Sequence, residues 1–118
     1  MYHRNLNVWK ESIALVKTTY DVISSFPKNE EYALSSQIRR CVVSIPSNIS
    51  EGCGRGTNKE LLYFLNVASG SLCELETQMY IADELGYIDD KSKFDEQFEK
   101  VQKILTGFKR HIKEQIDN

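Results

Sequence analysis

Basic side chains and glycines lie close together in residues 39–60, which read RRCVVSIPSNISEGCGRGTNKE. Two kinds of chemistry are conceivable here: glycine amides that hold a phosphate, or guanidinium groups that bind phosphates or carboxylates. The glycine spacing does not fit a phosphate loop, because no Gly-Lys pair is present and Thr57 stands where the dinucleotide-binding pattern needs glycine. We therefore expect a connection between two helices, with Gly52 at a left-handed helix end and Thr57 and Glu60 forming a capping box.

A set of basic residues is a candidate for contacts with nucleic-acid phosphates or with carboxylates of a neighbouring subunit. They are Arg39, Arg40, Arg55, Lys59, Lys103, Arg110 and Lys113, and their possible acidic partners are Glu51, Glu74 and Glu76. Because guanidinium groups bind carboxylates as well as phosphates, ion pairs within or between subunits are the preferred interpretation of Arg39 and Arg40, and RNA contact is the alternative. The basic residues near the C-terminus also complement a helix dipole, so a solvated helix surface is the preferred interpretation there.

The sequence offers no recognisable catalytic or metal-binding pattern. Its three cysteines form no C-x-x-C pair, and only His3 and His111 could supply imidazole ligands. We expect Cys41 and Cys73 in the core, as is usual for free cysteine, and Cys53 in a loop. We therefore assign no catalytic residue, no metal and no cofactor, and expect a protein that is not an enzyme.

The composition is that of an ordinary globular domain, with 41% hydrophobic and 27% charged residues among 118. Fifteen Lys and Arg against seventeen Asp and Glu give a formal net charge of -2, so a global positive field that would attract nucleic acid is lacking. Any RNA contact needs a local basic surface. No uncharged stretch is long enough to span a membrane. We expect one domain over residues 1–118, in a cytoplasmic protein with no membrane partner.

Hydrophobic residues recur at spacings of three and four in four segments, as in amphipathic helices. The expected helices cover about residues 6–25, 30–52, 57–85 and 90–116. The stripe of the third helix is Leu61, Leu65, Ala68, Leu72, Leu75, Met79 and Ala82, and that of the fourth is Phe94, Phe98, Val101, Leu105, Phe108 and Ile112. Gly86 should end the third helix, and Asp89 or Asp90 should cap the fourth.

The first helix carries more hydrophobic surface than one seam needs. Its main stripe, which we expect to face the core, is Leu6, Trp9, Ile13, Val16, Tyr20 and Ile23. A second row of Val8, Leu15 and Val22 lies beyond the row that contains Ser12 and Thr19. Because monomers seldom leave large apolar patches exposed, the surplus row predicts association with another chain.

The second helix contains Pro46 within a stripe that stays in phase on both sides of it. That stripe is Leu34, Ile38, Cys41, Ile45, Asn48 and Gly52. We favour one helix that is kinked near Pro46, where hydroxyl groups of Ser44, Ser47 and Ser50 can bond to backbone carbonyls. The alternative is a fresh helix with Pro46 in its first turn.

Four amphipathic helices with short connections predict antiparallel neighbours. No strand pattern or tandem repeat in the sequence competes with this arrangement. The expected fold is all-α: an antiparallel, up-down-up-down, left-handed four-helix bundle whose second helix is kinked near Pro46.

Three segments together resemble a known family. They read NVWKESIALV, SSQIRRCVVSIPSNISEGCGR and GSLCELETQMYIADELGYI, and they are similar to the four-helix-bundle family of 23S rRNA intervening-sequence proteins. The likeness spans nearly the whole chain. Its most specific parts are QIRR, SIPSNISEG and GSLCELETQ, because their order and spacing coincide as well as their composition.

The resemblance implies a bundle that assembles into a ring-like homopentamer, encoded within an rRNA intervening sequence or as a separate bacterial gene. A related branch comprises retroelement accessory proteins, whose strongly basic pentamers bind nucleic acid and a reverse transcriptase. This chain departs from that branch because its net charge is negative. The expected role is a non-enzymatic, oligomeric, RNA-associated accessory protein that contacts RNA or a ribonucleoprotein. The alternative is a structural scaffold whose ring binds a protein partner.

Overall fold

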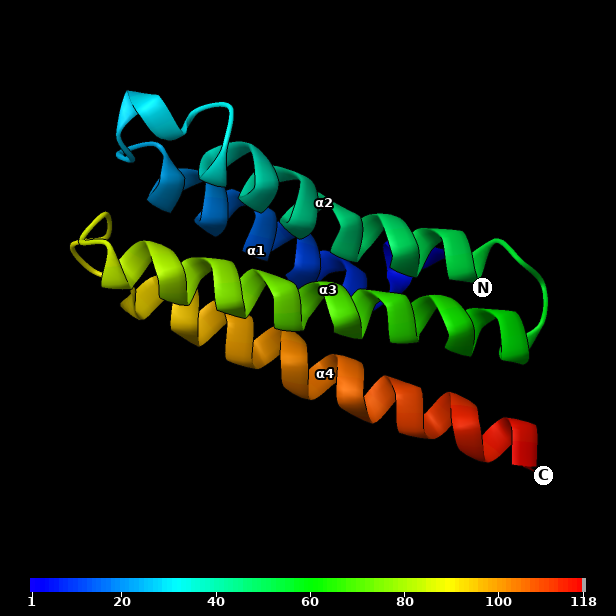
Figure 1. The fold of residues 1–118 in the computed structure, drawn as a ribbon. Coiled ribbons are helices and arrows are strands. Elements are labelled where there is room, and N and C mark those ends of the chain that lie inside the picture. The colour runs from blue at the N-terminus through cyan, green and yellow to red at the C-terminus, as the bar shows by residue number, and fades with distance from the viewer. Residues whose placement is uncertain (118) are drawn as a thin grey trace.

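The computed structural model describes residues 1–117 and folds into four long helices joined by short connections (Figure 1). The helices are α1 (Asn7–Ile23), α2 (Leu34–Cys53), α3 (Asn58–Glu84) and α4 (Ser92–Asp117), and short 3-10 helices cover His3–Asn5 and Lys28–Glu30. No strand occurs within residues 1–117. The prediction of an all-α four-helix bundle is confirmed, and its left-handed twist stays a prediction.

Each helix has two neighbours. Helix α1 packs against α2 and α4, and α3 packs against the same two, whereas within the described residues α1 does not pack against α3. Helices α1 and α3 therefore occupy diagonal corners, and their outer surfaces face in opposite directions. The molecule measures 49 by 24 by 21 Å.

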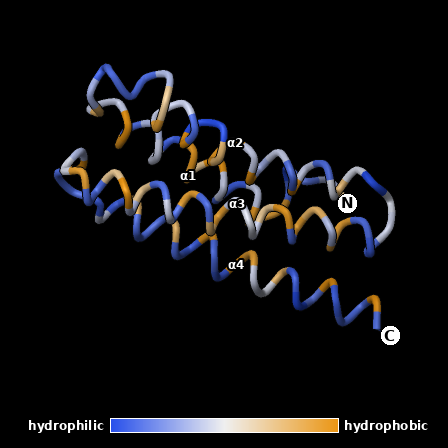
Figure 2. The backbone as a smooth tube through the Cα atoms, viewed as in Figure 1, coloured by the Kyte–Doolittle hydropathy of each residue, from blue (hydrophilic) through white to orange (hydrophobic). Residues whose placement is uncertain are grey.

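The core lies between the helices and contains the predicted stripes of α2, α3 and α4. The α3 stripe is buried from Leu61 to Ala82, and the α4 stripe is buried except for Phe108, which is half-buried. Ile38, Ile45 and their neighbours supply the α2 side. Figure 2 shows hydrophobic residues alternating with hydrophilic ones along the helices. Burying each large aliphatic or aromatic side chain contributes about 1.5–3 kcal/mol, so this shared core is the main source of stability.

Helix α1 turns a different face to the core from the one predicted. Its buried row is Val8, Ser12, Leu15, Thr19 and Ile23. The predicted core stripe is confirmed only in part: Ile23 is buried, Leu6, Trp9 and Val16 are half-buried and pack at the edge of the core, Ile13 is half-buried and Tyr20 is exposed. Ser12 can be buried because its hydroxyl donates to the Trp9 carbonyl at 2.7 Å. The surplus apolar surface of α1 is therefore the row that contains Trp9 and Val16.

Helix α2 runs without interruption through Pro46, so the alternative of a fresh helix at that position is wrong. The Ser44 hydroxyl donates to the Cys41 carbonyl at 2.6 Å, and the Ser50 hydroxyl donates to the Ser47 carbonyl at 3.0 Å. These are bonds of the kind predicted beside the proline. A kink of the helix axis stays a prediction.

The start of α2 lies at Leu34 instead of near residue 30, because residues 28–30 form a 3-10 helix and a turn follows them. The start of α3 carries the predicted cap, in which Thr57 Oγ1 accepts the Glu60 N–H at 3.2 Å. Gly86 follows α3 with a φ of 79°, a left-handed conformation that glycine adopts without steric cost.

The cap of α4 comes from Asp90, one of the two residues predicted for it. Asp90 Oδ1 accepts the Ser92 N–H at 2.9 Å. Hydrogen bonds from Ser92 hold the pKa of the Asp90 carboxyl below its ordinary value, because they favour the charged form.

Gly52 does not end α2 in a left-handed conformation, so this prediction is wrong. It is buried inside the helix, where a Cβ atom would lie 2.9 Å from Phe64 Cβ and 3.0 Å from Leu61 Cδ1. The glycine is needed because α2 and α3 approach each other too closely for any side chain. The left-handed glycine of this connection is Gly56, with a φ of 92°.

We predict that Gly52→Ala lowers the free energy of unfolding by about 1–3 kcal/mol, the usual cost of overpacking a rigid contact. The measurement is urea unfolding at one fixed protein concentration. Gly107→Ala is the matched control, because Gly107 lies within α4 with no atom within 4 Å of an added Cβ. There alanine should stabilise the helix by about 0.5–1 kcal/mol. Equal effects of the two substitutions would contradict the close contact.

Candidate functional site

The cysteines do not form a reactive centre. Cys41 lies in the core, where its thiol donates to the Ser71 carbonyl at 3.1 Å, and burial together with the charge of Glu74 raises its pKa to about 12. The predictions for the other two are wrong: Cys53 is the buried last residue of α2, not a loop residue, and Cys73 is exposed on α3. Burial also raises the pKa of Cys53. Because the thiolate is the nucleophile, neither buried thiol is activated.

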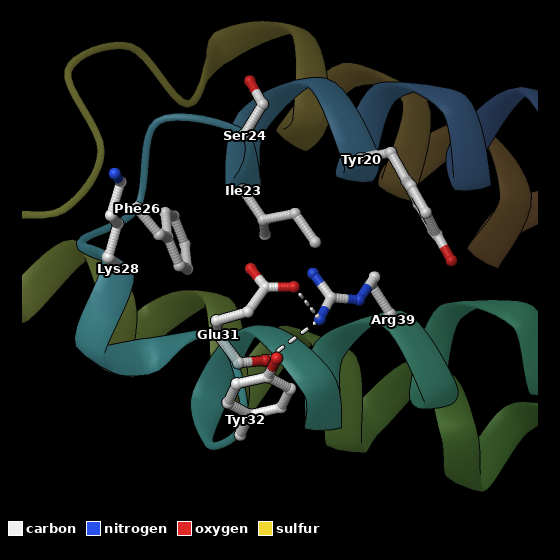
Figure 3. Close-up of a pocket in the computed structure, with 8 residues that line it drawn as sticks. All are labelled: Tyr20, Ile23, Ser24, Phe26, Lys28, Glu31, Tyr32 and Arg39. Carbon is white, nitrogen blue, oxygen red and sulfur yellow. Dashed lines mark hydrogen bonds and ion pairs between the residues drawn. The ribbon is translucent and has the colours of Figure 1, made fainter.

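Arg39 fixes the turn that precedes α2. Its Nη2 donates to Glu31 Oε1 at 2.8 Å and to the Glu31 carbonyl oxygen at 3.0 Å. Figure 3 shows the guanidinium group beside this carboxylate. Helical spacing gives no signal for this partner, because Glu31 lies in the turn and not on α2. None of the three predicted acids is the partner of Arg39.

The Arg39 and Glu31 side chains lie in a hollow of about 650 Å³ between the end of α1 and the start of α2. Tyr20 reaches into it from α1 and Tyr32 from the turn before α2 (Figure 3). Buried Ile23 and Phe26 form an apolar floor, and Lys28 stands at the edge. We call this site the tyrosine hollow. The sequence pattern did not single it out.

Arg55 is bonded within the connection between α2 and α3. Its Nη2 lies 2.7 Å from Glu51 Oε1, and its guanidinium carbon lies 5.1 Å from the centre of the Phe64 ring. Both charged side chains are about half exposed, so the ion pair contributes less than about 1 kcal/mol. Glu51, one of the three expected acidic partners, thus pairs with Arg55, which lies four residues later.

Arg40 faces a separate polar groove of about 370 Å³ between α2 and α3, which Ser44, Ser71 and Glu74 also line. The Ser44 and Ser71 hydroxyl groups bond to each other across it at 2.8 Å. Within residues 1–117 neither Arg40 nor Glu76 makes an ion pair. Arg40 and Glu74 are therefore brought into one groove without direct pairing.

The other basic candidates are spread along α3 and α4. Lys103 pairs with Glu99 at 3.2 Å on the exposed side of α4. Lys59, Arg110 and Lys113 are exposed at the end of the bundle that holds the α2–α3 connection and the C-terminal part of α4 (Figure 1). We call these last three residues the basic end.

A hydrogen bond joins the two helices that carry the basic end, from Asn58 Nδ2 to Gln115 Oε1 at 3.3 Å. Arg39, by contrast, bonds to the turn at the opposite end of the bundle. The predicted basic residues therefore do not form one continuous surface.

An apolar groove runs along the outer face of α1 and α2. Trp9, Ile13 and Val16 line it from α1, and Val43 and Pro46 line it from α2. Val43 is 41% exposed although it lies in the middle of a helix. We call these five residues the α1–α2 face. The sequence signalled a surplus apolar surface on the first helix but not which row would form it.

A second apolar surface lies along the outside of α3. It consists of Tyr63, Val67, Tyr80 and Ile81, all of which are exposed, and we call it the α3 ridge. Because α3 is diagonal to α1, this ridge and the α1–α2 face lie on different sides of the bundle. The regular stripe in the sequence of α3 predicts its buried face and gives no signal for these outward residues.

No helix among residues 1–117 combines the length and apolarity needed to cross a membrane. The same residues contain no cluster of three or more His, Cys, Asp or Glu side chains suited to hold a metal ion. No curated protein matches the sequence.

Residues 4–107 match the model of a protein family described as 23S rRNA-intervening sequence protein. The match covers the whole of α1, α2 and α3 and more than half of α4. It includes the three segments on which the resemblance was recognised. The chain therefore belongs to the family of 23S rRNA-intervening sequence proteins.

Proposed function

We propose that the chain is a non-enzymatic assembly protein whose copies associate through the α1–α2 face into the ring-like homopentamer that the family resemblance implies. The observation that carries this proposal is the apolar groove of that face, where half-buried Trp9, Ile13 and Val16 lie beside exposed Val43. A continuous apolar surface on the outside of a bundle is typical of an association site.

A second copy of the chain supplies a surface that suits this groove. The α3 ridge consists of four uncharged side chains, with exposed Glu74 and Thr77 between Val67 and Tyr80, and it lies on a different side of the bundle. The ridge of one copy can therefore pack against the α1–α2 face of the next. A contact between two different surfaces repeats head to tail and closes into a ring when the rotation permits. The copy number of five comes from the family resemblance alone.

Val43→Glu should disrupt this assembly. Placing an uncompensated carboxylate in a desolvated contact costs about 3–5 kcal/mol, which corresponds to a rise of at least about 100-fold in the dissociation constant. Light scattering at micromolar concentration should give an oligomer for the natural chain and a monomer for the variant. Circular dichroism should show the same helical content, because the side chain is already partly exposed.

Thr106→Glu is the matched control for that substitution. Thr106 is exposed on α4, outside both apolar surfaces, so the oligomer mass should not change. A natural chain that is monomeric, or a Val43→Glu variant that keeps the oligomer mass, would refute association through the α1–α2 face.

The reactivity of Cys73, which is exposed on α3 between Val67 and Tyr80, tests the α3 ridge independently of oligomer mass. Cys73 is the exposed thiol, whereas Cys41 and Cys53 are buried with raised pKa values. Its reaction with a disulfide reagent at pH 8 should slow as protein concentration rises and copies cover the ridge. Val43→Glu should restore the fast reaction at every concentration. A reaction rate that is independent of concentration would exclude the α3 ridge from the interface.

RNA association is a second candidate function, which the basic end and the family's description both favour. Lys59, Arg110 and Lys113 are exposed there, and they form no ion pair within residues 1–117. A cytoplasmic site of action would suit a protein that associates with ribosomal RNA. If RNA is not retained, a scaffold whose ring binds a protein partner is the alternative.

Salt dependence tests the RNA contact. If Arg110 and Lys113 each neutralise a phosphate, the logarithm of the affinity for single-stranded RNA should fall with the logarithm of salt concentration, and the double change Arg110→Gln and Lys113→Gln should reduce the slope by about 1.4. The same charge change at Lys10 and Lys17 on α1 serves as control and should leave the slope unchanged. Equal slopes for both double variants would exclude the basic end.

A further inference from the structure

We propose that the tyrosine hollow binds a nucleotide, with the planar base against Tyr32 and Tyr20 and the phosphate beside Arg39. The juxtaposition that supports this is an aromatic wall, an apolar floor and a cationic edge in one hollow of about 650 Å³. The inference goes beyond self-association. Where the base belongs to an RNA strand, it rests on the proposed RNA association and names its site.

The aromatic wall is presented by a turn that is held in place from two sides. Arg39 Nη2 donates to both the carbonyl and the carboxylate of Glu31, at 3.0 and 2.8 Å. The Tyr87 hydroxyl donates to Glu30 Oε2 at 2.8 Å, which ties the turn to the connection between α3 and α4. Tyr32 lies in this anchored turn, and yet its side chain is 96% exposed. The turn that carries Tyr32 is therefore held in place, while the Tyr32 ring itself is uncovered and open to a stacking ligand.

The inner part of the hollow suits a planar aromatic ligand. Tyr20 is 41% exposed on the opposite side of the hollow, and Ile23 and Phe26 close the bottom. Figure 3 shows Tyr20 and Tyr32 extending from different segments around the Arg39 side chain. Bases stack on tyrosine with little regard to sequence, because every base has a π-face. The hollow should therefore accept any unpaired base.

The charges favour an anion at the edge. Lys28 and Arg39 are cationic and Glu31 is the anionic residue of the lining, so the lining carries a net positive charge within a chain whose formal net charge is -2. The Arg39–Glu31 contact is partly exposed, so its carboxylate is neutralised without removing the guanidinium from solvent. A phosphate can therefore approach the free edge of Arg39, while Lys28, on the other side of Phe26 (Figure 3), adds to the positive charge around the hollow.

The first test uses saturation-transfer NMR on the full chain, which detects weak ligands of large assemblies. AMP should receive saturation on its base protons, whereas ribose 5-phosphate at the same concentration should show little signal. Tyr32→Ala should weaken AMP binding by about 10-fold, in line with the loss of one stacking contact. Tyr32→Phe should retain binding. Tyr2→Ala is the matched control, because Tyr2 is also exposed, at 55%, but lies before the start of α1 and not at its end, and it should leave AMP binding unchanged.

The second test separates the two sources of the nucleotide. Fluorescence anisotropy of a labelled single-stranded hexanucleotide should report the same Tyr32→Ala defect if the natural ligand is an unpaired base of RNA. AMP binding without hexanucleotide binding would identify a free nucleotide instead. An unchanged salt slope in the Arg110 and Lys113 double variant, with the Tyr32 effect retained, would refute RNA contact at the basic end and leave the hollow intact.

Three results would overturn the proposal. Equal binding of AMP and ribose 5-phosphate would show an anion site without base recognition, and no binding of AMP or the hexanucleotide would show no nucleotide site. A shift of the oligomer mass to monomer in Tyr32→Ala, by light scattering, would show that a second copy of the chain covers the hollow. In each case the tyrosines would not be a nucleotide platform.

Discussion

The close packing of α2 against α3 is the contact on which the other features of the bundle depend. At one end, Gly52 lets α2 approach α3 until only a hydrogen atom fits opposite Phe64. In the middle, the Ser44 and Ser71 hydroxyl groups meet at 2.8 Å. These two points fix both the distance and the register of the hairpin. Because the register is fixed, the α2–α3 connection places Arg55 over the Phe64 ring and the start of α3 beside the end of α4.

Helix α1 packs into the groove between α2 and α4, and the shape of that groove decides which face of α1 is buried. Leu15 and Val8 fill the core, and between them lies small Ser12, whose hydroxyl is satisfied by its own helix. Trp9 and Tyr20 lie on other sides of α1, where Trp9 is half-buried and Tyr20 is exposed. The outward row is consequently apolar and only partly covered: His3 lies against the Trp9 ring, Trp9 and Val16 pack at the edge of the core, and Tyr20 stays exposed. Thus the packing that stabilises the monomer also creates the surface that favours association.

Much of the fold could be predicted from the sequence, because α3 and α4 each carry one apolar stripe and their ends carry local signals such as Thr57 and Gly86. The face of α1 could not, because two apolar rows compete and periodicity does not reveal which row its neighbours accept. Gly52 was misread for a related reason: a glycine near a helix end suits either a left-handed cap or a close contact, and the choice depends on the partner helix. The tyrosine hollow depends on Glu31 and Tyr32, which were expected in the second helix but form a turn before the first residue of its apolar stripe, so helical spacing does not identify it.

The charge distribution indicates that the affinity for RNA depends on assembly of several copies. The ion pairs of Arg39 and Arg55 order their local turns, but they are partly exposed and each contributes little to the free energy of unfolding, so both arginines stay open to phosphate. A single basic end offers few phosphate contacts, and the net charge of -2 opposes long-range attraction. A ring presents the same basic end several times on one particle. Linked sites bind a long strand far more tightly than one site does, because later contacts form at a high effective concentration. A weak basic surface is therefore compatible with RNA association when the chain is assembled, whereas the monomer would hold RNA poorly at physiological salt.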